Sequence, residues 1–153
     1  MEVLLDTNLL LIYSRDSTIA KRIEEQYDIF NSNNNLYVSA ITLGELNALA
    51  KKLNLGTARK ENILKIINKM AKIRINLQEL IDRYGDIDAY SQGKLVGKKG
   101  SFTARNMGKN DIWIAATASL FELKLFTTDK DFHHLDGEFL NLEFIDLERF
   151  KDH

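Results

Sequence analysis

Short apolar runs of strand length alternate along this chain with longer segments whose apolar residues recur at helical spacing. The run from Val3 to Asp6 precedes a helical pattern formed by Leu9, Leu10 and Ile12. Strands that are separated by helices do not pair as hairpins, which favours a parallel sheet covered by helices on both faces. We therefore predict an α/β fold, a three-layer αβα domain with a mainly parallel central sheet. The further strands that we expect are Leu36–Ala40, Ile73–Leu77, Lys124–Thr128 and Leu142–Leu147.

Several of the expected helices begin at recognisable capping residues. Thr42 and Glu45 have the spacing of a capping box, so we expect a helix to start at Thr42. Asn110 is placed to cap a helix over Asp111–Leu123. The segment Leu80–Leu95 has a weaker helical pattern that two glycines interrupt. These boundaries put Glu45 and Asp111 in the first turns of their helices.

The composition excludes several classes of protein. The 153 residues suffice for one core of ordinary size and contain no linker or repeat, so we expect a single domain over residues 1–153. The sequence has no cysteine, which excludes disulfides, thiolate zinc sites and a cysteine nucleophile. No apolar run approaches the length that spans a bilayer, and the N-terminus lacks the basic start of a signal peptide. We therefore expect a cytoplasmic protein with no membrane partner.

A basic segment stands out in a chain whose net charge is only −1. Residues 89–110 contain basic side chains and no acidic one, so the rest of the chain is acidic. Such a segment is either a solvated loop or a surface that contacts the phosphates of a nucleic acid. The second interpretation depends on whether neighbouring residues carry out phosphate chemistry. The basic side chains are those of Lys94, Lys98, Lys99, Arg105 and Lys109.

Four acidic residues fall at positions where the predicted fold exposes them to a ligand. Asp6 and Asp129 each end a predicted strand, and ligands of open parallel sheets sit at the carboxyl ends of the strands. Glu45 and Asp111 are expected in first helical turns, where the helix dipole favours acids. Taken singly, each of the four also has a purely structural explanation as a turn or helix-start residue.

Taken together, the four acids predict a metal site. Carboxylates crowded at one edge of a sheet raise one another's pKa, and such a cluster usually persists because a hard cation neutralises it. Oxygen ligands alone suit Mg²⁺ or Mn²⁺. A metal ion held in this way supports phosphodiester hydrolysis, because it activates water and stabilises the attacking and leaving oxygens.

The residues around each acid resemble the motifs of PIN domains, especially those of VapC-type toxins. The similarity runs from Met1 to about Leu147, and the motifs occur in the family's order. They are Leu5-Asp6-Thr7-Asn8, Gly44-Glu45-Leu46, Asn110-Asp111-Ile112-Trp113 and Thr127-Thr128-Asp129-Lys130-Asp131-Phe132.

The resemblance implies a function and roles for individual residues. It implies a ribonuclease that uses Mg²⁺ or Mn²⁺, forms a homodimer and is inhibited by a cognate antitoxin protein. Asn8 and Thr127 match positions that support the site by hydrogen bonding, whereas we interpret Asp131, a fifth acid, as a turn or cap residue. The basic segment before Asp111 departs from the shortest family members, and our hypothesis is that it holds RNA near the metal. The metal-binding and catalytic acids implied by the resemblance are Asp6, Glu45, Asp111 and Asp129.

Two other functions remain open at this point. The same acids would serve a Mg²⁺-dependent DNA nuclease or phosphatase, although Asp6 lacks the second aspartate two residues on that aspartyl-phosphate enzymes normally show. A catalytically silent PIN-like module that binds metal or a partner protein is the other alternative. The adjacent His133 and His134 make a poor metal pair, and we expect them in a surface turn.

Overall fold

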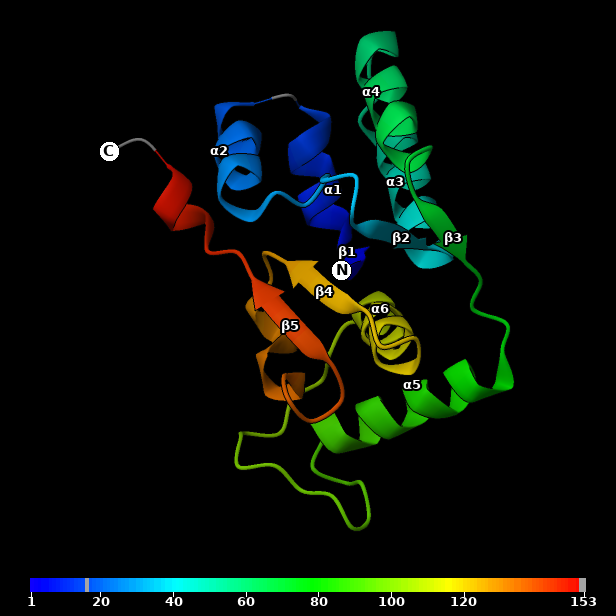
Figure 1. The fold of residues 1–153 in the computed structure, drawn as a ribbon. Helices are drawn as coiled ribbons and strands as arrows, with labels where there is room; N and C mark the ends of the chain where they lie inside the picture. Colours follow the sequence, from blue (N-terminus) through cyan, green and yellow to red (C-terminus); the bar gives the residue numbers. More distant parts are fainter. Residues whose placement is uncertain (16, 152–153) are drawn as a thin grey trace.

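A computed structural model, which describes residues 1–15 and 17–151, contains a five-stranded parallel sheet in the order β3-β2-β1-β4-β5 (Figure 1). This confirms the predicted fold class. The strands are β1 (Glu2–Leu5), β2 (Asn35–Ser39), β3 (Ala71–Ile73), β4 (Lys124–Thr127) and β5 (Asn141–Phe144).

The strand order places a topological switch beside β1. The chain builds outward from β1 to β2 and β3, then returns to pair β4 against the other edge of β1. Leu5 of β1 is level with Phe126 of β4, so the two strands end side by side. Ligands of open α/β sheets bind at such a switch, outside the carboxyl ends of the strands.

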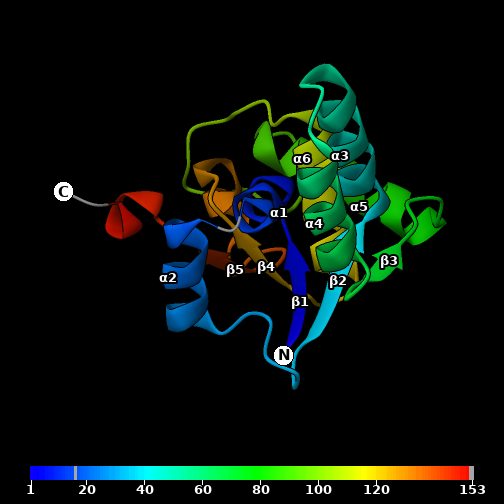
Figure 2. The same cartoon turned by 90° about the horizontal axis from the view of Figure 1, so that it is seen from above.

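Helices cover both faces of the sheet (Figures 1 and 2). One face carries α1 (Thr7–Ser14), α2 (Thr18–Tyr27), α3 (Ala40–Lys52) and α4 (Thr57–Ile67). The other face carries α5 (Gln78–Ser91), α6 (Lys109–Leu120) and the 3-10 helix η1 (Lys130–Leu135). A second 3-10 helix, η2 (Leu147–Phe150), follows β5 and packs with α2. No helix among the described residues is long and apolar enough to cross a membrane.

The central strands are buried on both faces, which explains why they read as continuous apolar runs. Val3 and Leu5 point into the core on the α1–α4 side, whereas Leu4 between them points into the core below α5 and α6. All three are fully buried. Burial of each such side chain contributes about 1.5–3 kcal/mol, so β1 is held rigidly and Asp6 at its end has a fixed position.

Two predicted helix starts are wrong, and one of the errors moves an acidic residue out of the first turn. α3 begins at Ala40, because the Ser39 side chain caps it by accepting from the backbone N–H of Ile41, so Glu45 lies in the second turn and forms no capping box. α6 begins at Lys109 after Gly108, which caps it without a side-chain hydrogen bond. Asn110 is therefore inside the helix, although Asp111 remains in the first turn.

Other boundaries also differ from the prediction. β3 starts two residues earlier and ends four residues earlier than predicted, and β5 ends at Phe144, after which the chain turns into η2. α5 runs unbroken through Gly85 and ends at Ser91. α2 was not predicted at all, although Ser17 caps it and its buried residues, Ala20 and Ile23, have helical spacing. The strong polarity of the rest of α2 obscured that short apolar face.

Candidate metal centre

Asp6 lies directly after β1 and caps α1. Its side chain is only 4% exposed. Oδ1 accepts a hydrogen bond from the backbone N–H of Thr7 at 2.7 Å, and Oδ2 accepts one from the hydroxyl of Thr127, also at 2.7 Å. Both oxygens of this carboxylate are therefore held in place.

Thr127 connects the ends of β1 and β4. While its hydroxyl donates to Asp6, the same oxygen accepts from the backbone N–H of Asp129 at 3.0 Å. Thr127 is fully buried. One threonine thus positions both strand-end aspartates, which are the two acids that the sequence places at carboxyl ends of strands.

Glu45 is held by Thr7, whose hydroxyl also contacts Thr42, and the sequence analysis predicted neither contact. The Thr7 hydroxyl lies 2.8 Å from Oε1 of Glu45 and 3.1 Å from the hydroxyl of Thr42. A hydroxyl has a single proton, so Thr7 donates to the carboxylate and accepts from Thr42. Thr42 is one helical turn before Glu45, so the spacing that we interpreted as a capping box instead places both side chains beside Thr7.

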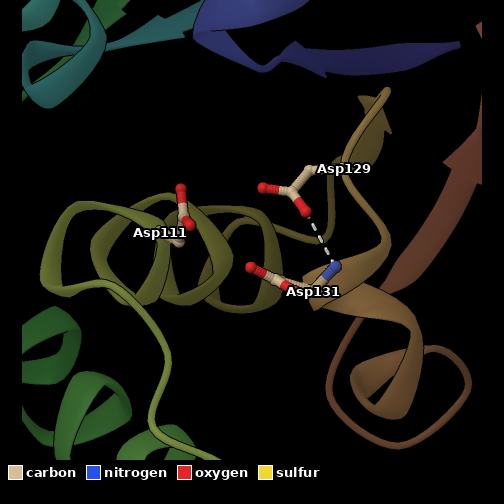
Figure 3. Close-up of side chains that lie close together, drawn as sticks. All are labelled: Asp111, Asp129 and Asp131. Carbon is tan, nitrogen blue, oxygen red and sulfur yellow. Dashed lines mark hydrogen bonds between the residues drawn. The ribbon is translucent and has the colours of Figure 1, made fainter.

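Three carboxylates form the tightest acidic group among the described residues. Each of Asp111, Asp129 and Asp131 offers an oxygen, and these oxygens all lie within 4.8 Å of one another. In Figure 3, Asp111 projects from α6 toward Asp129 and Asp131, which come from the end of β4 and the start of η1. Asp111 and Asp129 are half-buried and Asp131 is exposed, so the group is open to solvent on one side.

Asp131 lies in the first turn of η1 but does not cap it. The capping residue is Asp129, whose Oδ1 accepts from the backbone N–H of Asp131 at 2.9 Å and so starts η1. This turn carries the Asp131 carboxylate to the oxygens of Asp111 and Asp129. A cap two residues before it therefore brings a fifth acid into the cluster.

The electrostatics couple all five acids. Burial, followed by the charges of its four acidic neighbours, raises the pKa of Asp111 to about 7. Burial is also the main cause that raises the pKa of Asp6, to which the charges of Asp129 and Glu45 add. Asp6 and Glu45 thus lie within electrostatic reach of the tight group without belonging to it. The acidic neighbours of Asp111 are Asp6, Asp129, Glu45 and Asp131.

This donor set fits a hard divalent cation. All the donors are carboxylate oxygens, which Mg²⁺ and Mn²⁺ prefer. Oxygens within 4.8 Å of one another are close to the spacing around one ion with metal–oxygen distances of about 2.0–2.1 Å. After burial, the charges of the neighbouring acids also raise the pKa of Asp111, and a bound cation would relieve the repulsion between these carboxylates.

Two open cavities adjoin the carboxylates. One, of about 470 Å³, follows the small residues of α3 past Glu45 and reaches Asn110. The other, of about 280 Å³, is lined by residues 103–107 and by Asp131. The acidic cluster therefore borders open space beside α3 and beside the loop before α6.

Asn8 is not part of this hydrogen-bond network. Its side chain is exposed in the first turn of α1, and it forms no hydrogen bond with the described residues. The structure therefore gives no contact through which Asn8 would support the acids.

The basic segment forms the loop between α5 and α6, and its five basic side chains differ in their surroundings. Lys94, Lys99 and Lys109 are exposed. Lys98 donates to the carbonyl of Glu138 at 3.0 Å and lies over the ring of Phe139. Arg105 is half-buried. The loop is thus fixed in part by one of its own lysines.

The two histidines have different environments, and the predicted surface turn is correct only for His133. His133 is exposed and packs edge-on against Phe144. The ring of His134 is half-buried, and its Nε2 lies 2.7 Å from the hydroxyl of Ser91. Burial lowers the pKa of His134 to about 4. Neither belongs to a metal-binding group among the described residues.

The comparisons with known proteins agree with this architecture. The model of the PIN domain family matches residues 3–138. No curated protein matches the sequence. Among solved structures, the chain resembles one in VapBC2 from Rickettsia felis bound to a DNA fragment from their promoter, with 22% identity over 95% of this chain and 100% of that chain and a TM-score of 0.68.

Two further solved structures give similar values. A chain of FitAcB from Neisseria gonorrhoeae has 22% identity, covers 95% of this chain and 97% of its own length, and gives a TM-score of 0.66. A chain of VapBC-1 from nontypeable Haemophilus influenzae has 22% identity, covers 94% of this chain and 98% of its own length, and gives a TM-score of 0.62. At this level of identity the likeness shows a shared fold.

Proposed function

Since the chain belongs to the PIN domain family, we propose that it is a divalent-metal-dependent endoribonuclease and the toxin of a toxin–antitoxin pair. One observation carries the proposal: three aspartate oxygens lie within 4.8 Å of one another at the switch point of a parallel sheet, beside a buried aspartate. The family's members are nucleases, and this donor set suits the ion that phosphodiester hydrolysis uses.

In this proposal the tight group of Asp111, Asp129 and Asp131 holds Mg²⁺ or Mn²⁺, and Asp6 and Glu45 complete the catalytic acids. The ion, when bound, lowers the pKa of a water molecule and neutralises charge on the phosphate. The protein's own contribution is positioning. Thr127 holds Asp6 and the backbone of Asp129, and Thr7 holds Glu45, so these carboxylates do not have to reorganise when substrate binds.

The cluster also makes cleavage conditional on the cation. Carboxylates at the site repel a phosphodiester, so RNA approaches closely only when positive charge offsets them. Basic side chains of the loop before α6 would supply part of that charge from the side. The RNA-binding side chains that we propose are Lys94, Lys98, Lys99, Arg105 and Lys109.

The partner proteins follow from the same proposal. One similar solved structure is described as a toxin–antitoxin complex from Klebsiella pneumoniae and another as a member of the VapBC family of toxin–antitoxin systems. We propose that this chain likewise binds a cognate antitoxin. We propose that it forms a homodimer and acts in the cytoplasm. Exposed apolar side chains that a partner could cover include Leu53, Leu64 and Phe121.

The experiment that tests the reaction compares purified wild-type protein with Asp6→Asn, Asp111→Asn and Glu25→Gln. Glu25 is exposed on α2, on the face opposite α6, and serves as the matched control. Each protein is incubated with single-stranded RNA, structured RNA and single-stranded DNA of the same sequence, with Mg²⁺, Mn²⁺ or chelator.

We expect metal-dependent RNA cleavage by the wild type and the control, and none by the two aspartate variants. Equal cleavage by all four proteins would reveal a contaminating nuclease. Cleavage of DNA in place of RNA would identify a DNA nuclease. Binding of metal with no cleavage of any substrate would favour a silent module.

A further inference from the structure

We propose that Arg105 forms a phosphate-binding subsite for the RNA strand in the cavity next to Asp131. This inference rests on the proposed ribonuclease function. It separates Arg105 from the other basic residues of the loop, which share its charge but not its surroundings.

The backbone of Arg105 and the loop just before it are both held in place. Its N–H donates to the carbonyl of Ser91 at 2.8 Å, which ties the end of the loop to the end of α5. Three residues earlier, the ring of Phe102 packs against Tyr90 and His134, with ring centroids 5.1 Å and 4.9 Å away. Arg105 thus projects from an anchored part of the loop.

The side chain of Arg105 lacks a partner. Its Nε is buried and has no hydrogen-bond partner among the described residues, and its guanidinium forms no ion pair with them. A buried donor without an acceptor costs about 1–3 kcal/mol, so its retention suggests that a ligand satisfies it. Arg59 has a similar unpartnered Nε, but it does not line either cavity that adjoins the acids.

The cavity joins Arg105 to the acidic cluster. Its volume is about 280 Å³, and Asp131 lines the same space as Arg105 although the two form no ion pair. Thr103 and Asn106, also in the lining, offer a hydroxyl and an amide as further donors. A ligand in this cavity therefore meets several hydrogen-bond donors and also Asp131, one of the proposed metal ligands.

An RNA strand fits this combination of donors and an acidic metal ligand better than an isolated anion does. A guanidinium presents a planar fork of N–H donors that matches the oxygens of a phosphate. Phosphates repeat along a strand, so one can bind at the cluster while its neighbour binds Arg105. Lys98 cannot take this role while it is engaged with Glu138 and Phe139.

The test measures binding and cleavage separately. Binding of a fluorescein-labelled single-stranded RNA is followed by anisotropy in chelator over a range of salt concentrations, for wild type, Arg105→Met, Arg105→Lys and Arg149→Met. Arg149 is an exposed arginine on η2 and is the matched control. Thermal unfolding is measured for all four proteins, and KM and kcat with Mn²⁺ where cleavage is found.

Loss of one phosphate contact on a single strand should lower the slope of log K against log salt by about 0.7. We therefore expect Arg105→Met to show this reduced slope, an affinity lower by about tenfold and a raised KM. Its melting temperature should equal or exceed that of the wild type, because no protein contact is lost. Arg105→Lys should keep the slope and lose part of the affinity, and Arg149→Met should match the wild type.

An unchanged slope and affinity in Arg105→Met would overturn the proposal and point to a carboxylate of a partner protein as the anion. Equal losses in Arg149→Met, or a fall in melting temperature that explains the loss, would also overturn it. An Arg105-dependent slope in a protein that cleaves no RNA would instead contradict the proposed catalytic function and leave the phosphate subsite standing.

Discussion

The hydroxyl of Thr127 donates to Oδ2 of Asp6 at 2.7 Å, a contact between residues that are 121 positions apart in the chain. Both side chains are enclosed by the protein, since Thr127 is fully buried and Asp6 nearly so. The oxygen of Thr127 also receives the backbone N–H of Asp129. A single hydroxyl therefore fixes the relative position of two acids from different strands.

Replacement of Thr127 by valine should reduce metal-dependent cleavage without unfolding the protein. Valine keeps the shape but leaves Asp6 Oδ2 without its donor, and loss of such a supporting hydrogen bond typically lowers activity or metal affinity by about 10–100-fold. Cleavage rate against Mn²⁺ concentration measures both effects. Thr127→Ser retains the hydroxyl and should recover most of the activity; equal losses in both variants would contradict the positioning role.

Asp111→Asn should stabilise the metal-free protein. The pKa of Asp111 is raised from 3.8 to about 7, so the stability contributed by its neutral form is fully present below pH 3.8 and is lost as the pH rises through about 7. The melting temperature of the variant should therefore exceed that of the wild type by an amount that grows between pH 4 and 7 and then stays constant. Differential scanning fluorimetry in chelator measures this difference.

Added Mn²⁺ should make the wild type more stable than Asp111→Asn, the reverse of their order in chelator. A ligand that binds only the folded state raises its stability in proportion to ln(1 + [L]/Kd), and the wild type keeps the carboxylate that the variant lacks. Glu25→Gln should follow the wild type in both conditions. A variant that gained as much as the wild type from Mn²⁺ would show that Asp111 does not bind the ion.

His134 should make the protein sensitive to acid. Burial, together with the positive charge of Arg105, lowers its pKa from 6.5 to about 4. A depressed pKa contributes stability that is fully present above pH 6.5 and is lost as the pH falls toward 4. Urea unfolding at several pH values should therefore show a larger loss for the wild type than for His134→Gln. Parallel losses in the two proteins would mean that the histidine titrates normally.

Gly100→Ala should loosen the loop before α6. A Cβ at this position would overlap the Phe102 ring and lie 2.8 Å from the Tyr90 hydroxyl, so the packed rings have to shift. Overpacking of this kind costs about 1–3 kcal/mol. Gly85→Ala in α5 is the control, because its Cβ meets open space. Replacing a glycine inside a helix by alanine should raise the free energy of unfolding by about 0.5–1 kcal/mol. Thermal melts that moved in the same direction would contradict the prediction.

The sequence alone determined the layered parallel fold and placed Asp6 and Asp129 at strand ends. Both conclusions depend on local signals, since an apolar run that ends in an acid is visible over a few residues and alternation with helices fixes the sheet type. The sequence also correctly placed Asp111 in the first turn of α6, again from a local signal, although the cap is Gly108 and not Asn110.

Only the tertiary structure decided which side chains meet. The strand order and the docking of α3, α6 and η1 bring Thr7 to Glu45 and Asp131 to Asp111. The same packing leaves Nε of Arg105 buried without a partner among the described residues. Sequence periodicity reports which face of an element is apolar, but not which element packs against it. The relative placement of elements is set by the burial of both faces of the sheet at once, and that is a property of the whole fold.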